Sequence, residues 1–190
     1  MRLNRFFEIA ILMECGMGVV AVLLAWPFGL RLWDYFSFDL ASFGLSVAAT
    51  GITIPVYFVL RVLPFDWLRQ MIELVRTIYR NEMQSLPVWK LALIALAAGF
   101  GEELLFRGLL QQGLCNLFPG KELIVIVVVS LLFGLAHCLT KMYVVLAFLI
   151  SLYLGLLFFW TGNLLVPLLV HALYDFFVFC HLHLECRADQ

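Results

Sequence analysis

Charge is scarce in this sequence. Only 13% of its 190 residues are Asp, Glu, Lys or Arg, 64% are hydrophobic, and the net charge is −1. Ordinary soluble domains carry about 25% charged residues, so the composition excludes that class. The basic residues are scattered and form no stripe, which excludes nucleic-acid binding, because that function needs a basic surface. The sequence is that of an integral membrane protein.

Several common motifs are also missing. The five cysteines lie mostly inside apolar runs without CxxC spacing, which excludes a disulfide framework or a cysteine zinc site. There is no HExxH pair, and no Ser or Cys lies in the sequence context of a nucleophile. The charged start of the chain precedes an apolar run without a small-x-small cleavage site, which favours an uncleaved first span over a signal peptide.

Long hydrophobic runs, in contrast, are abundant. Between the second and third runs, residues 64–87 place apolar and charged side chains on opposite helical faces, which predicts an amphipathic helix on the membrane surface. The predicted fold class is all-α, a polytopic transmembrane helical bundle of about six spans plus one interfacial amphipathic helix. The runs long enough to cross about 30 Å of hydrocarbon are residues 6–26, 40–63, 88–113, 122–139, 142–160 and 163–183.

These segments divide the chain into three predicted parts. Residues 1–87 hold two spans and the interfacial helix, residues 88–183 form a four-span core, and residues 184–190 are a short polar tail. Lys and Arg concentrate in the loops that are cytoplasmic if the amino terminus is inside. We therefore expect a multi-pass protein with both termini cytoplasmic, located in the plasma membrane if the source is bacterial.

Three charged residues interrupt the third span: Glu102, Glu103 and Arg107. A central charge costs about 2.5 to 3.5 kcal/mol, whereas each Leu, Ile, Phe or Val returns only about 0.3 to 0.6 kcal/mol. Such residues are therefore candidates for a functional site. Glu103 and Arg107 are four residues apart on one helix face, so we expect them to pair. Glu102 points about 100° away from Glu103, which leaves it free to accept a proton.

Two other spans carry polar residues. The fourth span ends with Phe133 and His137, and the sixth contains His171 and Asp175, four residues apart on one helix face. Buried polar groups need hydrogen bonds, and buried charges need partners. We therefore expect His137, His171 and Asp175 to meet Glu102 in one cluster. Glu103, Arg107 and Phe133 are expected to support it.

Three further polar residues lie outside this predicted cluster. Glu14, in the first span, is expected to pair with another group within the bundle, and its role stays open. His181 and His183 are close to the end of the last span, where we expect them to be solvated at the membrane interface.

A carboxylate and two imidazoles can support hydrolysis in two ways. The carboxylate can deprotonate a water that attacks a peptide carbonyl, while a nearby donor stabilises the oxyanion. Alternatively, Glu102, His137 and His171 can hold a zinc ion that keeps an open water position. A third interpretation is that the charges form a structural polar contact between helices.

The order of the motifs provides further information. Three motifs follow one another on the third, fourth and sixth spans: Glu102-Glu103 with Arg107, Phe133 with His137, and His171 with Asp175. In this order they resemble the motifs of the CPBP family. This family unites type II CAAX prenyl endopeptidases with Abi-type bacteriocin-immunity proteins, and the resemblance covers residues 88–183. It implies an intramembrane peptidase in which Glu102 activates water, His137 assists, and His171 and Asp175 complete the site.

The resemblance also implies a cofactor and a substrate class. The family has been described both as metalloendopeptidases and as glutamate proteases, so either no cofactor or a divalent metal such as zinc is expected. The expected partner is a membrane protein or lipidated peptide, prenylated or anchored at its carboxy terminus. Prenyl endopeptidases commonly have Asn where this chain has Asp175. A carboxylate donates no hydrogen bond unless protonated, which favours an organising or ligand role for Asp175.

Two functions of other classes stay open at the level of sequence. One is a non-proteolytic bacteriocin-immunity or partner-binding membrane protein that uses the same bundle. The other is a proton-coupled transporter, because Glu and His chains also serve as proton relays. The absence of a paired repeat disfavours the transporter.

Overall fold

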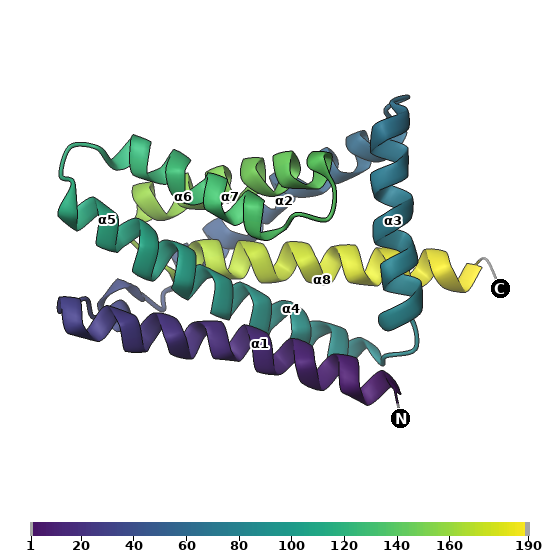
Figure 1. Cartoon of the computed structure of the whole chain (residues 1–190), viewed down its shortest axis with the longest axis horizontal. Coiled ribbons are helices and arrows are strands. Elements are labelled where there is room, and N and C mark those ends of the chain that lie inside the picture. The colour runs from purple at the N-terminus through teal and green to yellow at the C-terminus, as the bar shows by residue number, and fades with distance from the viewer. Residues whose placement is uncertain (1, 189–190) are drawn as a thin grey trace.

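The computed structural model describes the backbone of residues 2–188 and the side chains of residues 5–188, and within these ranges the regular structure is entirely helical (Figure 1). This agrees with the predicted fold class. Arg2, one of the basic residues expected on the cytoplasmic side, lies outside the described side chains. The α-helices are α1 (Arg2–Ala25), α2 (Leu40–Val62), α3 (Asp66–Glu82), α4 (Val88–Glu103), α5 (Gln112–Leu117), α6 (Glu122–Ala136), α7 (Lys141–Thr161) and α8 (Leu165–Ala188).

The hydrophobic runs all form helices, but they differ in length. Within the described residues, four segments are long and apolar enough to cross a membrane: Arg5–Phe28, Leu40–Val62, Lys141–Thr161 and Leu165–Ala188. Helix α6 is apolar but has only 15 residues. The predicted third span is built from α4, a π-helical segment (Leu104–Gln111) and α5. The chain is thus a helical membrane bundle whose third and fourth predicted spans are not single long α-helices.

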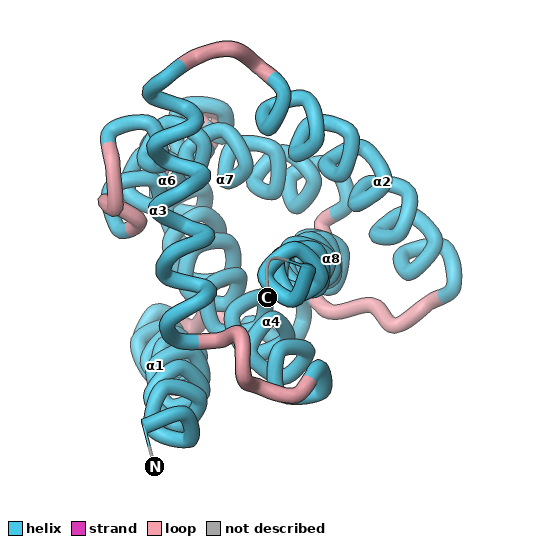
Figure 2. The backbone as a smooth tube through the Cα atoms, turned by 90° about the vertical axis from the view of Figure 1, so that its right-hand side faces the viewer, coloured by secondary structure: helices cyan, strands magenta, loops and turns pink. Residues whose placement is uncertain are grey.

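Helix α8 lies at the centre of the bundle. It packs against α4, α2 and α7, while α6 pairs with α7 and α1 packs on α4 and the π-helical segment. Figure 2 looks along α8 and shows α4 on one side of it and α2 on another, with α6 and α7 beyond. The beginning of α1 and the end of α8 lie at the same end of the bundle. Any side chain on α8 that points into the bundle can therefore contact several helices.

Helix α3 runs across that same end of the bundle, transverse to the other helices (Figure 1). It buries Leu68, Met71 and Tyr79 against the bundle and leaves charged residues such as Glu73 on its outer face. Apolar side chains on one face and charged side chains on the other are what the sequence predicted for this segment. Its orientation across the end of the bundle fits a helix in the plane of the membrane surface.

Of the two histidines near the end of α8, His183 is buried, contrary to expectation, whereas His181 is partly exposed. His183 is only 5% exposed, and its Nδ1 lies 3.0 Å from the hydroxyl oxygen of Tyr79 on α3. His181 is half-buried, with its Nδ1 3.1 Å from the hydroxyl oxygen of Tyr57 on α2. The expectation was wrong for His183 because α8 continues to Ala188, beyond the predicted end of the span. Both imidazoles therefore lie among neighbouring helices.

Close packing of α6 on α7 depends on a glycine. A Cβ atom at Gly134 would lie only 2.7 Å from the carbonyl oxygen of Val144. Small residues allow helices in membranes to approach in this way. The contact lies one turn before His137 and sets how closely the end of α6 sits against α7.

Candidate active site

Glu103 and Arg107 form the ion pair that their spacing predicted. Arg107 Nη1 donates to Glu103 Oε1 at 3.1 Å, and Arg107 Nε lies 3.0 Å from Glu103 Oε2. Both residues are fully buried. Arg107 Nη2 also donates to the backbone oxygen and to Oγ of Ser151 on α7, at 2.8 and 2.9 Å. The guanidinium is thus held between α4 and α7, and its charge is compensated by a single carboxylate.

The π-helical segment begins directly after Glu103. Within it, Arg107 donates to Ser151, and Gln111 Nε2 donates to the backbone oxygen of Gly155 at 2.9 Å. Both the donors and the acceptors are four residues apart, so the segment and α7 are held in a defined register. The sequence predicted a regular helix here, because no residue type marks a π-helix; such segments are often found at functional sites.

Glu102 faces the two imidazoles. Its Oε1 lies 3.6 Å from His137 Nε2, and its Oε2 lies 3.9 Å from His171 Nε2. His171 Nε2 is also 3.5 Å from Asp175 Oδ2. The structure therefore brings the four residues of the predicted cluster together from α4, the end of α6, and α8. Glu102 is only 7% exposed, so the cluster lies inside the bundle.

The other ring nitrogen of each histidine is held by an acceptor. His171 Nδ1 lies 2.8 Å from Glu103 Oε1, and His137 Nδ1 lies 2.9 Å from the backbone oxygen of Phe133. A carbonyl oxygen, or a carboxylate paired with Arg107, can only accept a hydrogen bond. Each Nδ1 must therefore carry a proton. In the neutral imidazole, each Nε2 then presents its lone pair toward Glu102.

Glu102 and the two Nε2 atoms are too far apart for direct hydrogen bonds. Good N–H···O bonds span 2.7 to 3.2 Å, whereas these pairs are 3.6 and 3.9 Å apart. Polar groups at such distances are commonly bridged by a water molecule. All three groups are acceptors when unprotonated, and a water molecule, which has two O–H donors, can donate to two of them at a time.

Phe133 contacts both imidazoles and the guanidinium of the site. Its ring stacks on His137 with centroids 4.4 Å apart and meets His171 edge-on at 6.2 Å. The Arg107 guanidinium lies 5.1 Å from its centroid, a cation–π distance. Phe133, which the sequence analysis predicted to support the site, is 3% exposed. It provides an apolar wall that fixes the orientation of both imidazoles.

A metal site is the alternative role predicted for the cluster. Glu102, His137 and His171 present atoms of the kinds that zinc binds. Among the described residues, however, no group of three or more His, Cys, Asp or Glu side chains is arranged so that it could hold a metal ion. The chemistry proposed below uses side chains and water, and no residue role in it depends on a metal.

Glu14 does not form the predicted pair. Its Oε2 is buried and has no hydrogen-bond partner among the described residues. Ser151, which holds Arg107, is a site residue that the sequence analysis missed. The only signal for Ser151 is a single small hydroxyl side chain within an apolar run, and such residues are common at helix contacts.

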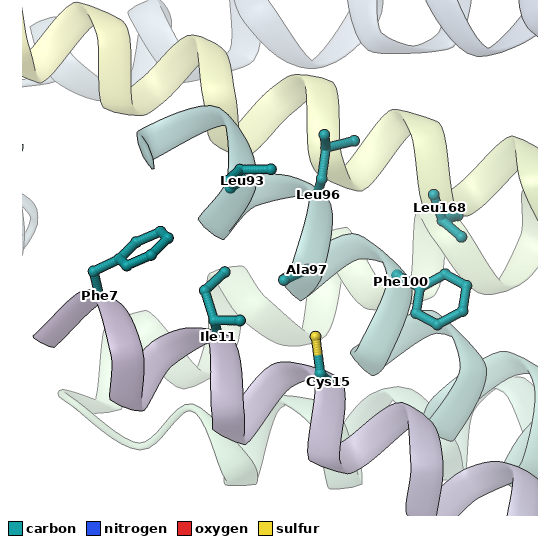
Figure 3. Close-up of a pocket in the computed structure, with 8 residues that line it drawn as sticks. All are labelled: Phe7, Ile11, Cys15, Leu93, Leu96, Ala97, Phe100 and Leu168. Atoms are coloured by element: carbon teal, nitrogen blue, oxygen red, sulfur yellow. The ribbon is translucent and has the colours of Figure 1, made fainter. Parts of the chain in front are cut away.

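One cavity of the bundle is apolar and separate from the polar cluster. It has a volume of about 430 Å³ and lies between α1 and α4, where Phe7, Ile11 and Cys15 face Leu96 and Phe100 (Figure 3). None of the four residues of the polar cluster, Glu102 included, lines this cavity. Hydrophobic volume alone therefore does not locate the site in this protein.

The comparisons with known proteins agree with the motifs. Residues 84–177 match the family of type II CAAX prenyl endopeptidase Rce1-like proteins. The chain is also 27% identical over 165 residues to the uncharacterized protein YpbD of Bacillus subtilis (strain 168), which covers 85% of this chain and 79% of that protein. No solved structure matches the chain. The matched segment contains all of Glu102, His137, His171 and Asp175, and the chain belongs to the Rce1-like family of type II CAAX prenyl endopeptidases, a family of intramembrane proteases.

Proposed function

We propose that the protein is an endopeptidase that hydrolyses a peptide bond with a water activated by Glu102. The observation that carries this proposal is the arrangement around that carboxylate. The Nε2 atoms of His137 and His171 face Glu102 at 3.6 and 3.9 Å, while each Nδ1 is occupied by another acceptor. Three groups that can take or return a proton thus face one another, and the proposed water lies among them.

The proposed step begins with proton transfer from the water to Glu102. The water oxygen forms a bond with the carbonyl carbon of the substrate, and the π electrons move to the carbonyl oxygen. An imidazole that carries a second proton on Nε2 can donate to this oxyanion. The C–N bond then breaks, the carbonyl re-forms, and the leaving nitrogen takes up a proton. The result is one carboxylic acid and one amine for each water consumed.

The neighbouring residues have positioning roles in this scheme. Glu103, held by Arg107, fixes the tautomer and orientation of His171. Asp175, 3.5 Å from His171 Nε2, compensates the charge of that imidazole when it is protonated. Because an ionised carboxylate cannot donate, Asp175 organises the site and does not stabilise the oxyanion.

The proposed substrate is a membrane-associated protein or lipidated peptide, prenylated or anchored at its carboxy terminus. Two features support this substrate class: the family to which the chain belongs and the location of the cluster inside a bundle of apolar helices. Nucleic acid is not part of the proposal.

We further propose that the site opens toward the end of the bundle crossed by α3, with both termini cytoplasmic. Helix α6 ends at Ala136 after 15 residues, which corresponds to about 22 Å of helical rise. This is less than the hydrocarbon thickness of about 30 Å. His137 therefore lies below the surface on the side of α3, and a short polar path is enough to admit water from that side.

The proposal can be tested with purified protein in liposomes. The probes are a fluorogenic farnesylated CAAX peptide and the same peptide without the lipid. We expect wild-type protein to cleave the farnesylated peptide and both Glu102→Ala and His171→Ala to lose cleavage. Glu8→Ala, an exposed position on α1, is the matched control and should remain active. Full activity in Glu102→Ala or His171→Ala, or no cleavage of either peptide by the wild type, contradicts the proposal.

A further inference from the structure

Helix α1 lies outside the matched residues 84–177, yet it contacts the glutamate motif directly. Gly101, the residue before Glu102, packs against the backbone of Glu14. A Cβ atom at position 101 would lie 2.0 Å from the Glu14 carbonyl oxygen and 2.8 Å from its carbonyl carbon. No side chain fits there. The contact therefore fixes the turn of α1 that carries Glu14 against the turn of α4 that carries Glu102.

One oxygen of the half-buried Glu14 carboxyl group has no hydrogen-bond partner among the described residues. This oxygen, Oε2, is also inaccessible, and both statements are true of Glu102 Oε2. An unsatisfied buried polar group costs about 1 to 3 kcal/mol. A carboxyl group kept at this cost in a membrane-spanning helix calls for a functional explanation. The four residues of the cluster, Glu102, His171, Asp175 and His137, all lie within electrostatic range of the Glu14 carboxyl group.

The cluster has many acceptors and few available donors. Glu102 and Asp175 are carboxylates, and the two Nε2 atoms present lone pairs when the imidazoles are neutral. Arg107 is committed to Glu103 and Ser151. A protonated carboxylic acid is a donor, and its neutral form is less costly to bury than a carboxylate. Glu14 is therefore suited to bring a proton to this site.

We propose that Glu14 is the general acid of the active centre, the group that protonates the leaving nitrogen. This inference rests on the proposed hydrolysis at Glu102. When the C–N bond breaks, its electron pair goes to nitrogen, which takes the proton of the Glu14 carboxyl group. Glu102 holds the proton from the attacking water and returns it to the Glu14 carboxylate through a water molecule. Both carboxyl groups then regain their starting states.

The test uses two substrates with the same farnesylated acyl part. One is an amide, whose nitrogen must be protonated to leave. The other is a nitrophenyl ester, whose phenolate leaves without protonation. We expect Glu14→Gln, which preserves the shape of the side chain, to lower kcat for the amide by about 10²- to 10⁴-fold, the usual contribution of general acid catalysis. The ester rate should change by less than about threefold, because the phenolate leaves without general acid catalysis.

The controls separate this inference from the hydrolysis itself. Glu8→Gln, on the same helix but exposed, should leave both rates unchanged. Glu102→Ala should lose both. If Glu102→Ala retains both activities, the hydrolysis proposal fails. If Glu102→Ala is inactive but Glu14→Gln cleaves the amide normally, or loses amide and ester cleavage equally, the role of Glu14 is overturned and the hydrolysis proposal stands.

A second pair of variants covers the case in which Glu14→Gln does not fold. Glu14→Asp keeps the acid with a shorter reach, and Glu14→Ala removes it. We expect Glu14→Asp to cleave the amide at least about tenfold faster than Glu14→Ala. The two variants should cleave the ester at similar rates. Equal amide cleavage in the two variants contradicts the inference.

Discussion

His171 Nδ1 lies 2.8 Å from Glu103 Oε1, and the same carboxylate is paired with the fully buried Arg107. This contact gives the two adjacent glutamates different tasks. Glu103 determines that the Nδ1 atom of His171 carries a proton, so Nε2 faces Glu102. Four side chains then act in sequence, from Arg107 through Glu103 and His171 to Glu102. A change at Glu103 affects both the stability of the bundle and the chemistry at its neighbour.

Removing the charge of Glu103 should destabilise the protein strongly. In Glu103→Gln, Arg107 keeps its charge but loses its buried counter-ion. Breaking a buried ion pair from one side costs about 3 to 5 kcal/mol, which can be measured by denaturant unfolding in micelles. Glu73→Gln removes the exposed partner of the Glu73–Arg76 pair on α3 and should leave stability nearly unchanged. Equal stability of the two variants contradicts the structural role of Glu103.

Removing the charge of Glu102 should lower peptide cleavage without destabilising the protein. Glu102→Gln keeps the size of the side chain, and Glu102 Oε2 has no hydrogen-bond partner among the described residues. We expect the free energy of unfolding to equal or exceed that of the wild type, because the substitution removes a buried charge that has no good partners. Peptide cleavage should fall by about 10²- to 10⁴-fold. Cleavage within about twofold of the wild type is inconsistent with Glu102 as the base.

The contact between α1 and α4 can be tested with a pair of glycines. Gly101→Ala introduces a Cβ atom that overlaps the Glu14 backbone, 2.0 Å from its carbonyl oxygen. Overpacking of this kind costs about 1 to 3 kcal/mol. Gly16→Ala is the matched control because no atom lies within 4 Å of its added Cβ, and alanine favours a helix over glycine by about 1 kcal/mol. Thermal unfolding should show destabilisation for the first and none for the second.

Metal dependence can be measured directly. The predicted ligands Glu102, His137 and His171 are not arranged as a metal-binding group among the described residues. We expect dialysis against a strong chelator to change the cleavage rate by less than about twofold, since the proposed base acts without a metal. Loss of cleavage in chelator that zinc restores supports instead the metallopeptidase alternative.

The start of α2 should respond to pH. Asp39 caps this helix, and hydrogen bonds from the Ser42 backbone and from the Ser37 and Ser42 hydroxyls hold the pKa of its carboxyl below the ordinary value. A pKa that is lower in the folded state means that the cap stabilises the protein above the unfolded pKa. That contribution is lost as the pH falls through the folded pKa. Asp39→Asn keeps a capping side chain without this titration, so its stability should fall less than that of the wild type between neutral pH and pH about 3. Identical acid profiles contradict this role.

Much of this protein follows from its sequence alone. Hydrophobic runs and the two-faced pattern of α3 are local properties, so the helical membrane bundle and its surface helix were predictable. The spacing of Glu103 and Arg107 places both on one helix face, and their ion pair was predictable for the same reason. The meeting of Glu102, His137, His171 and Asp175 followed from a stronger constraint, because intramembrane polar groups have few partners besides one another.

Only the tertiary structure decided how those groups face one another. Which nitrogen of each imidazole faces Glu102 depends on Glu103 and on the backbone at Phe133. The π-helical segment depends on Arg107 and Gln111 reaching α7, and the burial of His183 depends on where α3 crosses the bundle. Glu14 was expected to pair, yet it lies unpartnered beside the turn of Glu102. These relationships join residues far apart in the chain, and their distances are set by how helices pack, which local sequence patterns do not specify.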